Sequence, residues 1–257
     1  MTDSTGKRIV IVGASSGLGR CLASGLGERG ATLALLARRK DRLVDAAKEA
    51  GPGTIVMQCD VTDEASCRDA ITEAAAGLGG IDALIYTAGV GPLVRLVDAD
   101  AETWRYVFDT NVTGASLATA AAIPHLSESS GTALYLSSIS ASMTAPWPGL
   151  GPYAVSKAAL DKLVEAWRAE HPTIGFTRVV VGDCAGGEGD SMTGFNADWD
   201  RELVGELATT WVERNLITGA LMDVGHLVDG VDAVLRTAPG ATVPSITITP
   251  RPPAPPA

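Results

Sequence analysis

The sequence predicts an α/β fold, a doubly wound parallel sheet of about seven strands with helices on both faces. Two observations lead to this fold class. Short apolar runs alternate with longer helical patterns along most of the chain, and each apolar run is nearly continuous rather than alternating with polar residues. Continuous runs are typical of strands covered on both faces, and their alternation with helices favours right-handed crossovers between parallel neighbours.

The first half of the chain alternates regularly between the two patterns. Strands are predicted over residues 8–12, 32–37, 54–59 and 81–87. Helices are predicted between them over residues 17–29, 41–50 and 63–77, with Asp63 near the start of the last. This order predicts βαβ units that share one sheet.

The second half is predicted to extend the same sheet. Helices are predicted over residues 102–125 and 153–170, and strands over 133–137, 177–181 and 245–249. Residues 182–200, rich in Gly and Asp, predict a mobile flap over a pocket, with a plain surface loop as the alternative. No linker or repeat divides residues 1–250, which we predict to be one domain. The proline-rich residues 251–257 predict a disordered tail.

Composition narrows the classes of function. The 257 residues carry a formal net charge of −10, which disfavours a nucleic-acid partner. No apolar run reaches the roughly 18 residues of a membrane span, and the N-terminus shows no cleavable apolar segment, so we expect a cytoplasmic protein without a membrane partner. The four cysteines show no paired metal-ligand spacing; we expect buried free thiols and no metal.

A glycine-rich turn follows the first predicted strand and opens the first helix. Such a turn lets backbone approach a pyrophosphate, and free N–H groups at a helix start attract the anion. The spacing is GxxxGxG rather than GxGxxG, and a merely flexible turn is the alternative. The predicted cofactor-binding residues here are Gly13, Ser15, Ser16, Gly17, Leu18 and Gly19.

The end of the second predicted strand indicates which dinucleotide binds. NAD-binding sheets usually place an acid there, to accept hydrogen bonds from the ribose. This chain instead has Arg38 and Arg39, and Arg38 can bind a 2′-phosphate in a forked arrangement. We therefore predict NADP(H) as the cofactor. The alternative, that the cations merely decorate a helix start, conflicts with the positive end of the helix dipole.

Tyr153 and Lys157 suggest proton-transfer chemistry. Residues four apart share one face of a helix, and a nearby ammonium lowers the pKa of a phenol. A phenol with a lowered pKa can exchange protons when an alcohol is oxidised or a carbonyl reduced. Alone, the pair is weak, because Tyr and Lys meet at this spacing on many surface helices.

Taken together, the motifs resemble the classical short-chain dehydrogenase/reductase family over about residues 7–250. The quoted motifs are GASSGLG at 13–19, Asp60-Val61, Tyr86-Thr87-Ala88-Gly89, Asn111, Ser137-Ser138 and YAVSK at 153–157. All occur in the family's order and near its spacings. The resemblance implies a Rossmann-type fold and an NADP(H)-dependent oxidoreductase that interconverts a carbonyl and an alcohol.

The resemblance also implies roles for individual residues. Tyr153 would donate or accept the proton, and Lys157 would lower its pKa and hold the nicotinamide ribose. Ser138 would polarise the substrate oxygen, and Asn111 would sit in a helix kink and support a water linked to Lys157. The implied cofactor contacts are Asp60, Val61, Ala88, Gly89 and Gly182. Each polar residue has a structural alternative, such as capping a strand end or a turn.

The chain departs from the family pattern at three places. Tyr86 and Thr87 replace two asparagines. Ser138 lies 15 residues before Tyr153 where the family more often shows 13, a spacing that Ser140 has. After the sixth strand, the usual Pro-Gly pair and threonine are missing, which leaves the anchoring of the nicotinamide amide open.

Substrate and assembly are less defined by the sequence. A set of apolar side chains is expected to line a pocket for a small apolar carbonyl or alcohol, although ordinary loop or core packing is equally compatible: Trp147, Leu150, Met192, Phe195 and Trp199. Alanine-rich helices favour a homodimer or homotetramer. Alternative functions are a non-catalytic NADP(H) sensor on the same fold and a nucleotide-sugar epimerase or dehydratase, for which the chain looks short.

Overall fold

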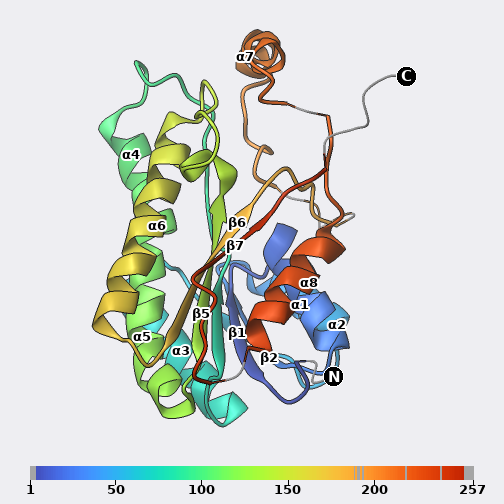
Figure 1. The fold of residues 1–257 in the computed structure, drawn as a ribbon, viewed down its shortest axis with the longest axis vertical. Helices are drawn as coiled ribbons and strands as arrows, with labels where there is room; N and C mark the ends of the chain where they lie inside the picture. Colours follow the sequence, from blue (N-terminus) through green and yellow to red (C-terminus); the bar gives the residue numbers. More distant parts are fainter. Residues whose placement is uncertain are drawn as a thin grey trace.

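A single seven-stranded sheet forms the centre of the molecule (Figure 1). The computed structural model describes residues 4–251 except 188, 190, 191, 193, 218 and 238. The strands are β1 (Arg8–Val12), β2 (Thr32–Ala37), β3 (Ile55–Gln58), β4 (Ala83–Tyr86), β5 (Thr132–Ser138), β6 (Gly175–Val181) and β7 (Ser245–Ile248). Their order is β3-β2-β1-β4-β5-β6-β7, and all neighbours are parallel. The predicted doubly wound fold is confirmed.

Helices cover both faces of this sheet (Figure 1). They are α1 (Gly17–Glu28), α2 (Lys40–Ala50), α3 (Glu64–Leu78), α4 (Ala101–Phe108), α5 (Gly114–Ser129), α6 (Gly151–Glu170), α7 (Arg201–Glu213) and α8 (Val224–Leu235). Helices α1, α2 and α8 share one face, and α3, α5 and α6 share the other. Helix α7 lies apart, beyond the carboxyl ends of the strands (Figure 1).

Two apolar cores lie against the two faces, and β1 contributes to both. Ile9 and Ile11 belong to the core under α1, α2 and α8, whereas Val10 and Val12 belong to the core on the opposite face. All four side chains are fully buried. Because successive side chains of a strand point to opposite faces, a strand between two cores must be apolar throughout.

The helix predicted over residues 102–125 is interrupted. A π-helical turn, Asp109–Thr113, separates α4 from α5. The buried Tyr86 hydroxyl donates a 2.6 Å hydrogen bond to the Thr110 carbonyl within this turn. The widened turn frees backbone groups from the regular α-helical pattern, and the phenol from β4 satisfies one of them.

Helices α7 and α8 are absent from the sequence-based prediction. Each begins after an aspartate whose side chain accepts hydrogen bonds from the first turn, Asp200 for α7 and Asp223 for α8. These N-caps are the signal that the sequence offered. The glycine-rich segment before α7 has no regular helical spacing, and this hid the start of the helix.

Two other predictions concern the flap expected at residues 182–200 and the tail expected at residues 251–257. In the segment after β6, a short bridge pairs Cys184 with Met222, which precedes α8, and another pairs Gly186 with Met192. Of the predicted tail, only Arg251 falls within the described residues, and 252–257 lie outside them. No helix in the described part of the chain combines the length and apolarity needed to cross a bilayer.

Candidate active site

The glycine turn packs against the end of the neighbouring strand β4. Gly13 has a φ of +92°, and a Cβ built on it would lie 2.5 Å from the Ala88 backbone nitrogen. A Cβ on Gly19 would lie 2.4 Å from the Thr87 Oγ1. Side chains at these two positions would push the turn away from β4, so both glycines are required by close approach and, at Gly13, by conformation.

The first turn of α1 leaves its backbone N–H groups exposed to a ligand at the glycine turn. In the described chain, no side chain caps its first turn, and that turn contains no acidic residue. The N-cap residue Ser16 is extended, and its hydroxyl is turned to an arginine rather than to the helix. The N–H groups of Gly17, Leu18 and Gly19 are therefore free of side-chain competition, which is the donor set that a pyrophosphate requires.

Arg39, rather than Arg38, reaches this turn. The Arg39 Nη2 donates to the Ser15 Oγ at 2.9 Å and to the Ser16 Oγ at 2.8 Å. The Arg38 side chain is exposed, and its backbone carbonyl accepts a hydrogen bond from the Gln58 amide. Arg38 was the residue that the sequence favoured for a phosphate contact. The structure brings its neighbour to the glycine turn instead.

Asp60 and Val61 follow β3 and lie near this turn. The Asp60 carboxylate accepts from the backbone N–H of Thr62 at 3.0 Å and from its hydroxyl at 2.7 Å. These bonds, with a smaller contribution from the positive charge of Arg38, hold the pKa of Asp60 below its usual value. Asp60 thus caps a turn, and Val61 is buried against α5 through Gly114.

Tyr86 and Thr87 replace the asparagines of the family pattern without loss of hydrogen bonding. The Thr87 Oγ1 donates to the Val12 carbonyl at 2.7 Å and so links β4 to β1. Tyr86 extends from β4 to the π-helical turn, as described above. Tyr86 thus joins β4 to the turn that carries Asn111, and Thr87 joins β4 to β1.

Ser138, Tyr153 and Lys157 meet at the carboxyl end of β5. Ser138 ends the strand, and its hydroxyl hydrogen-bonds with the Tyr153 phenol of α6. Ser138 also lies 2.9 Å from the Ser140 hydroxyl. The Lys157 Nζ donates to the Leu136 carbonyl at 2.7 Å. A Cβ on Gly89 would lie 3.4 Å from this ammonium, so Gly89 faces the same space.

Asn111 joins the β4–α4 loop to α6. It is fully buried in the π-helical turn. Its Oδ1 accepts from the Val90 N–H at 2.8 Å, and its Nδ2 donates to the Val90 carbonyl and to the Ser156 hydroxyl. Asn111 therefore fixes the position of Gly89 and Val90 relative to the helix of Tyr153 and Lys157.

The expected lowering of the Tyr153 pKa is wrong for this structure. Burial raises the pKa of Tyr153 to about 12, and only the hydrogen bond with Ser138 opposes it. The Lys157 Nζ lies 5.7 Å from the ring centroid and is directed to a backbone carbonyl, which explains why it does not acidify the phenol. Burial likewise lowers the pKa of Lys157 to about 8. Tyr153 is a neutral phenol at physiological pH.

Aromatic side chains cover Tyr153 on the side of α7. The Phe195 ring meets the Tyr153 ring edge-on with centroids 4.8 Å apart, and Trp199 and then Trp211 follow at 5.5 and 6.1 Å. Phe195 also lies against Gly91, where a Cβ would meet it at 2.3 Å. The Trp199 indole donates to the Gly91 carbonyl at 2.8 Å.

The other residues expected to line the pocket are farther from Tyr153. Trp147 stacks on Trp211 at 5.4 Å, Leu150 is buried and pairs through its backbone with Val94, and Met192 is exposed. Trp211 and Gly91 were not singled out from the sequence. No spacing rule relates them to Tyr153, since α7 and the β4–α4 loop approach it only in three dimensions.

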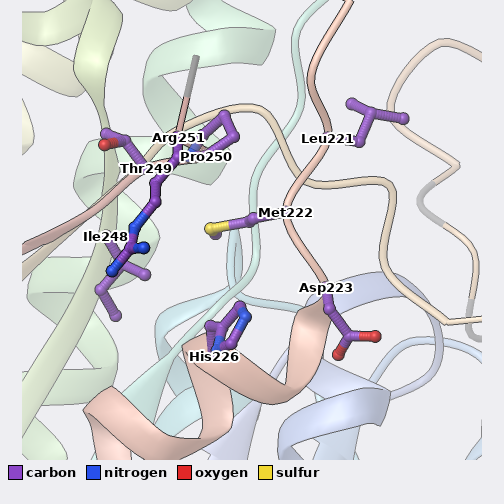
Figure 2. A pocket seen from close by; sticks show the side chains of 8 residues that line it. All are labelled: Leu221, Met222, Asp223, His226, Ile248, Thr249, Pro250 and Arg251. Atoms are coloured by element: carbon purple, nitrogen blue, oxygen red, sulfur yellow. The ribbon is translucent and has the colours of Figure 1, made fainter. Parts of the chain in front are cut away.

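The segment after β6 pairs with β7 and with Met222, and these neighbours also line a cavity. The Gly182 N–H donates to the Ile248 carbonyl, and the Asp183 carbonyl accepts from the Met222 N–H. The cavity, of about 550 Å³, is lined by Leu221, Met222, Asp223, His226, Ile248, Thr249, Pro250 and Arg251 (Figure 2). None of the predicted site residues lines it. Gly182 is thus placed at the sheet edge by β7.

A family model decides the affiliation of this chain. The model described as "short chain dehydrogenase" matches residues 7–197. The chain belongs to the short-chain dehydrogenase family. This is a family of oxidoreductases that use a nicotinamide cofactor. The matched residues include the glycine turn, the Asn111 turn, Ser138, Tyr153 and Lys157.

Curated relatives and solved structures agree with this family. "11-beta-hydroxysteroid dehydrogenase A" of Sesamum indicum is 37% identical over 186 residues, which cover 70% of this chain and 53% of the relative. "11-beta-hydroxysteroid dehydrogenase-like 4A" of Arabidopsis thaliana is 33% identical over 213 residues, 79% of this chain and 70% of the relative. The chain thus spans about half the length of the sesame relative.

Similar folds occur in bacterial and archaeal dehydrogenases. A short-chain type dehydrogenase/reductase from Mycobacterium marinum has a TM-score of 0.78 at 27% identity, covering 96% of this chain and 95% of that one. An alcohol dehydrogenase from Thermococcus sibiricus, complexed with 5-hydroxy-NADP, has a TM-score of 0.80 at 23% identity, covering 98% and 99%. The likeness to the archaeal protein concerns the fold alone.

Proposed function

We propose that this protein is an NADP(H)-dependent oxidoreductase that interconverts an apolar ketone or aldehyde with the corresponding alcohol, with Tyr153 as acid and base. The observation that carries the proposal is the meeting of Ser138, Tyr153 and Lys157 beside Gly89. A pure binding protein has no use for a phenol and a hydroxyl that share a hydrogen bond beside a buried ammonium.

In the reducing direction, the chain supplies two donors to one oxygen. When bound, the nicotinamide supplies the hydride to the carbonyl carbon. Ser138 and Tyr153 donate hydrogen bonds to the carbonyl oxygen, where negative charge develops in the transition state. Tyr153 then transfers its proton to that oxygen, which completes the alcohol. The raised pKa keeps the phenol protonated near neutral pH, and this suits the role of acid.

Oxidation requires the opposite state of Tyr153. The phenol must then accept the proton of the alcohol as the hydride leaves. With a pKa of about 12, the phenolate is scarce at neutral pH in this arrangement. We expect the rate of alcohol oxidation to rise with pH while Lys157 keeps its charge, and reduction to be the faster direction near pH 7.

The preference for NADP(H) rests on two arginines at the end of β2. Arg39 donates hydrogen bonds to the Ser15 and Ser16 hydroxyls of the glycine turn. The charge of Arg38 contributes to the lowered pKa of Asp60. Both cations flank the space between the turn and Asp60, where the adenosine ribose would lie. Guanidinium groups bind phosphate through paired, charge-assisted hydrogen bonds.

The aromatic side chains support an apolar substrate. Phe195 and Trp199 present ring surfaces near Tyr153, and the polar N–H of Trp199 is already occupied by the Gly91 carbonyl. A substrate approaching Tyr153 from this side meets hydrocarbon rather than charge. The named relatives in sesame and Arabidopsis are called hydroxysteroid dehydrogenases, so steroid ketones belong in the panel of substrates to be tested.

The catalytic proposal is tested with Tyr153→Phe on a panel of aldehydes, ketones and secondary alcohols. Loss of a general acid costs about 10²–10⁴-fold in rate, so turnover should fall by that factor while NADPH still binds. Ser140→Ala is a matched control, because the Ser140 hydroxyl hydrogen-bonds with the Ser138 hydroxyl and no hydrogen bond joins it to Tyr153 in the described part of the chain, so the variant should retain most activity. Cofactor binding by the wild type without turnover of any compound would favour the sensor instead.

The cofactor proposal is tested by titrating NADPH and NADH into wild type, Arg39→Gln and Arg38→Gln. A hydrogen bond to a charged group contributes about 1.5–3 kcal/mol, so Arg39→Gln should weaken NADPH about ten- to a hundredfold and leave NADH nearly unchanged. A larger loss of NADPH affinity in Arg38→Gln than in Arg39→Gln would assign the phosphate contact to Arg38, as the sequence predicts. Tighter binding of NADH by the wild type would refute the preference.

A further inference from the structure

Asp161 is a buried acid one helical turn after Lys157 on α6. Its relative exposure is 5%, and its polar neighbours are the Ser137 hydroxyl of β5 and the Arg178 guanidinium of β6. A buried carboxylate is strongly unfavourable unless hydrogen bonds and nearby charges compensate it. Its presence in this position therefore requires a partner charge.

Two positive groups face Asp161, from two elements. Lys157 precedes it by four residues, so the ammonium and the carboxylate share one side of α6. From β6, the Arg178 Nη1 lies 3.8 Å from the Asp161 Oδ2 and 3.5 Å from the Glu165 Oε1. From β5, the uncharged Ser137 hydroxyl faces the carboxylate. Glu165, on α6, is the other negative group nearby.

Lys157, like Asp161, is a buried charged group, and it carries the opposite charge. Its side chain is 5% exposed, and its hydrogen bond to the Leu136 carbonyl supplies no negative charge. Leu136 and Ser137 are consecutive residues of β5, so the ammonium and the carboxylate meet the same short stretch of strand. Burial lowers the pKa of Lys157 to about 8, and the charge of Asp161 opposes this shift.

We propose that Asp161 is a positioning residue of the active site, whose carboxylate is the buried counter-charge that keeps the Lys157 ammonium protonated. Asp161 acts through Lys157, from a position one helical turn further along α6. Burial raises the pKa of Asp161, and the Ser137 hydroxyl and the charges of Arg178 and Lys157 oppose that rise. Glu165 shares the arginine at the protein surface. The proposal rests on the proposed function only in that Lys157 is expected to contact the cofactor ribose.

The first test measures NADPH affinity against pH in wild type and Asp161→Asn. Wild-type affinity should fall as Lys157 loses its proton near pH 8. In Asp161→Asn, this fall should occur about one pH unit lower, equivalent to a tenfold change in the ratio of charged to neutral lysine. Asp161→Glu, which keeps the charge, should restore the wild-type midpoint. Glu165→Gln, the exposed partner of Arg178, should leave it in place.

A second test needs no cofactor. The pKa of Lys157 is about 8 in the fold and ordinarily 10.5, so the unfolded chain binds more protons between these values and stability rises with pH across that window. In Asp161→Asn, the rise in melting temperature should begin at lower pH. In a Lys157→Met background, the same substitution should no longer alter the pH dependence, because the titrating group is gone.

Several outcomes would overturn the proposal. An unchanged midpoint in Asp161→Asn, in both the NADPH and the melting measurements, would mean that Asp161 carries no charge that Lys157 senses. An equal shift of the pH midpoint in Glu165→Gln would mean that a surface charge, rather than Asp161 specifically, causes the effect. Asp161→Ser, a smaller neutral variant, replaces Asp161→Asn if the latter does not fold. If NADPH does not bind at all, the proposed function fails, but the melting experiment still decides the role of Asp161.

Discussion

The glycine turn and the aromatic cover of Tyr153 are assembled in different ways. The turn at residues 13–19 is fixed by backbone: Gly13 and Gly19 lie against β4 at distances that exclude a Cβ, and Thr87 bonds the Val12 carbonyl. The aromatic cover is held by side chains from distant segments, with Phe195 and Trp199 between α6 and α7. One is a property of sheet geometry, and the other of surface packing.

The difference indicates which of the two regions tolerates amino-acid substitutions. In the proposed function the turn accepts the same dinucleotide whatever the substrate, and Gly13 and Gly19 leave no room for another side chain. The aromatic cover uses ring contacts that are each worth about 0.5–1.5 kcal/mol, so individual rings can be exchanged without loss of the fold. We therefore expect substitutions in the turn to affect stability and cofactor together, and those in the cover to affect substrate alone.

The largest effect is expected for Gly13→Ala. A Cβ there meets the Ala88 nitrogen, and the residue must keep a φ of +92°, so the free energy of unfolding should fall by about 3 kcal/mol and NADPH binding should weaken. Gly53→Ala is the matched control. Its φ is +84°, but no atom lies within 4 Å of the added Cβ. Denaturant unfolding of both variants separates the clash from the backbone strain.

Equal losses in the two glycine variants would contradict the argument from close approach. The turn would then depend on backbone conformation alone, and its contact with β4 would contribute little. The comparison between the two regions would lose its basis at Gly13.

An intermediate effect is expected for Tyr86→Phe. The variant leaves the Thr110 carbonyl of the π-helical turn without its buried donor, which costs about 1–3 kcal/mol of stability and should loosen the turn that holds Asn111. Turnover should fall as well. Tyr135→Phe is the control: its partner, the Thr119 hydroxyl, keeps a bond to the Ala115 carbonyl. Calorimetry and steady-state rates measure the two effects.

Retained turnover in Tyr86→Phe at reduced stability would show that the π-helical turn contributes to folding but not to catalysis. The link from β4 to Asn111 would then be structural.

The smallest effect on stability is expected for Phe195→Ala. The variant loses the edge-on ring contacts with Tyr153 and Trp199, each worth about 0.5–1.5 kcal/mol, at a half-buried position, and should raise the KM of apolar carbonyl substrates several-fold while NADPH affinity is unchanged. Met192→Ala, in the same segment but exposed, should leave both unchanged. A loss of NADPH affinity in Phe195→Ala would break the separation between cofactor and substrate regions.

Much of the catalytic group was readable from the sequence because short-range spacing encodes it. Tyr153 and Lys157 are four residues apart on one helix, and Ser138 ends an adjacent strand. Asn111 was expected in a kink and lies in the π-helical turn. Spacing did not reveal whether the pKa of Tyr153 is raised or lowered, because that shift depends on burial and on where the Lys157 ammonium points.

The remaining features required the fold. Which of two adjacent arginines meets the glycine turn depends on the side-chain direction at the end of β2. The meeting of Phe195 with Gly91, and of Asp161 with Arg178, joins segments about a hundred and about seventeen residues apart. The start of α7 was hidden because a single aspartate cap is a weaker signal than a long apolar period.

The sequence by itself determined the parallel sheet, the glycine-rich turn and the helix that carries the phenol and the ammonium. These follow from local periodicity, from glycine conformation and from helical spacing, all of which act between near neighbours in the chain. Only the tertiary structure determined the protonation state of Tyr153, which arginine contacts the glycine turn, and the burial of the Asp161 carboxylate near Lys157. Burial and electrostatics depend on every atom within a few ångströms, and those atoms come from remote parts of the chain.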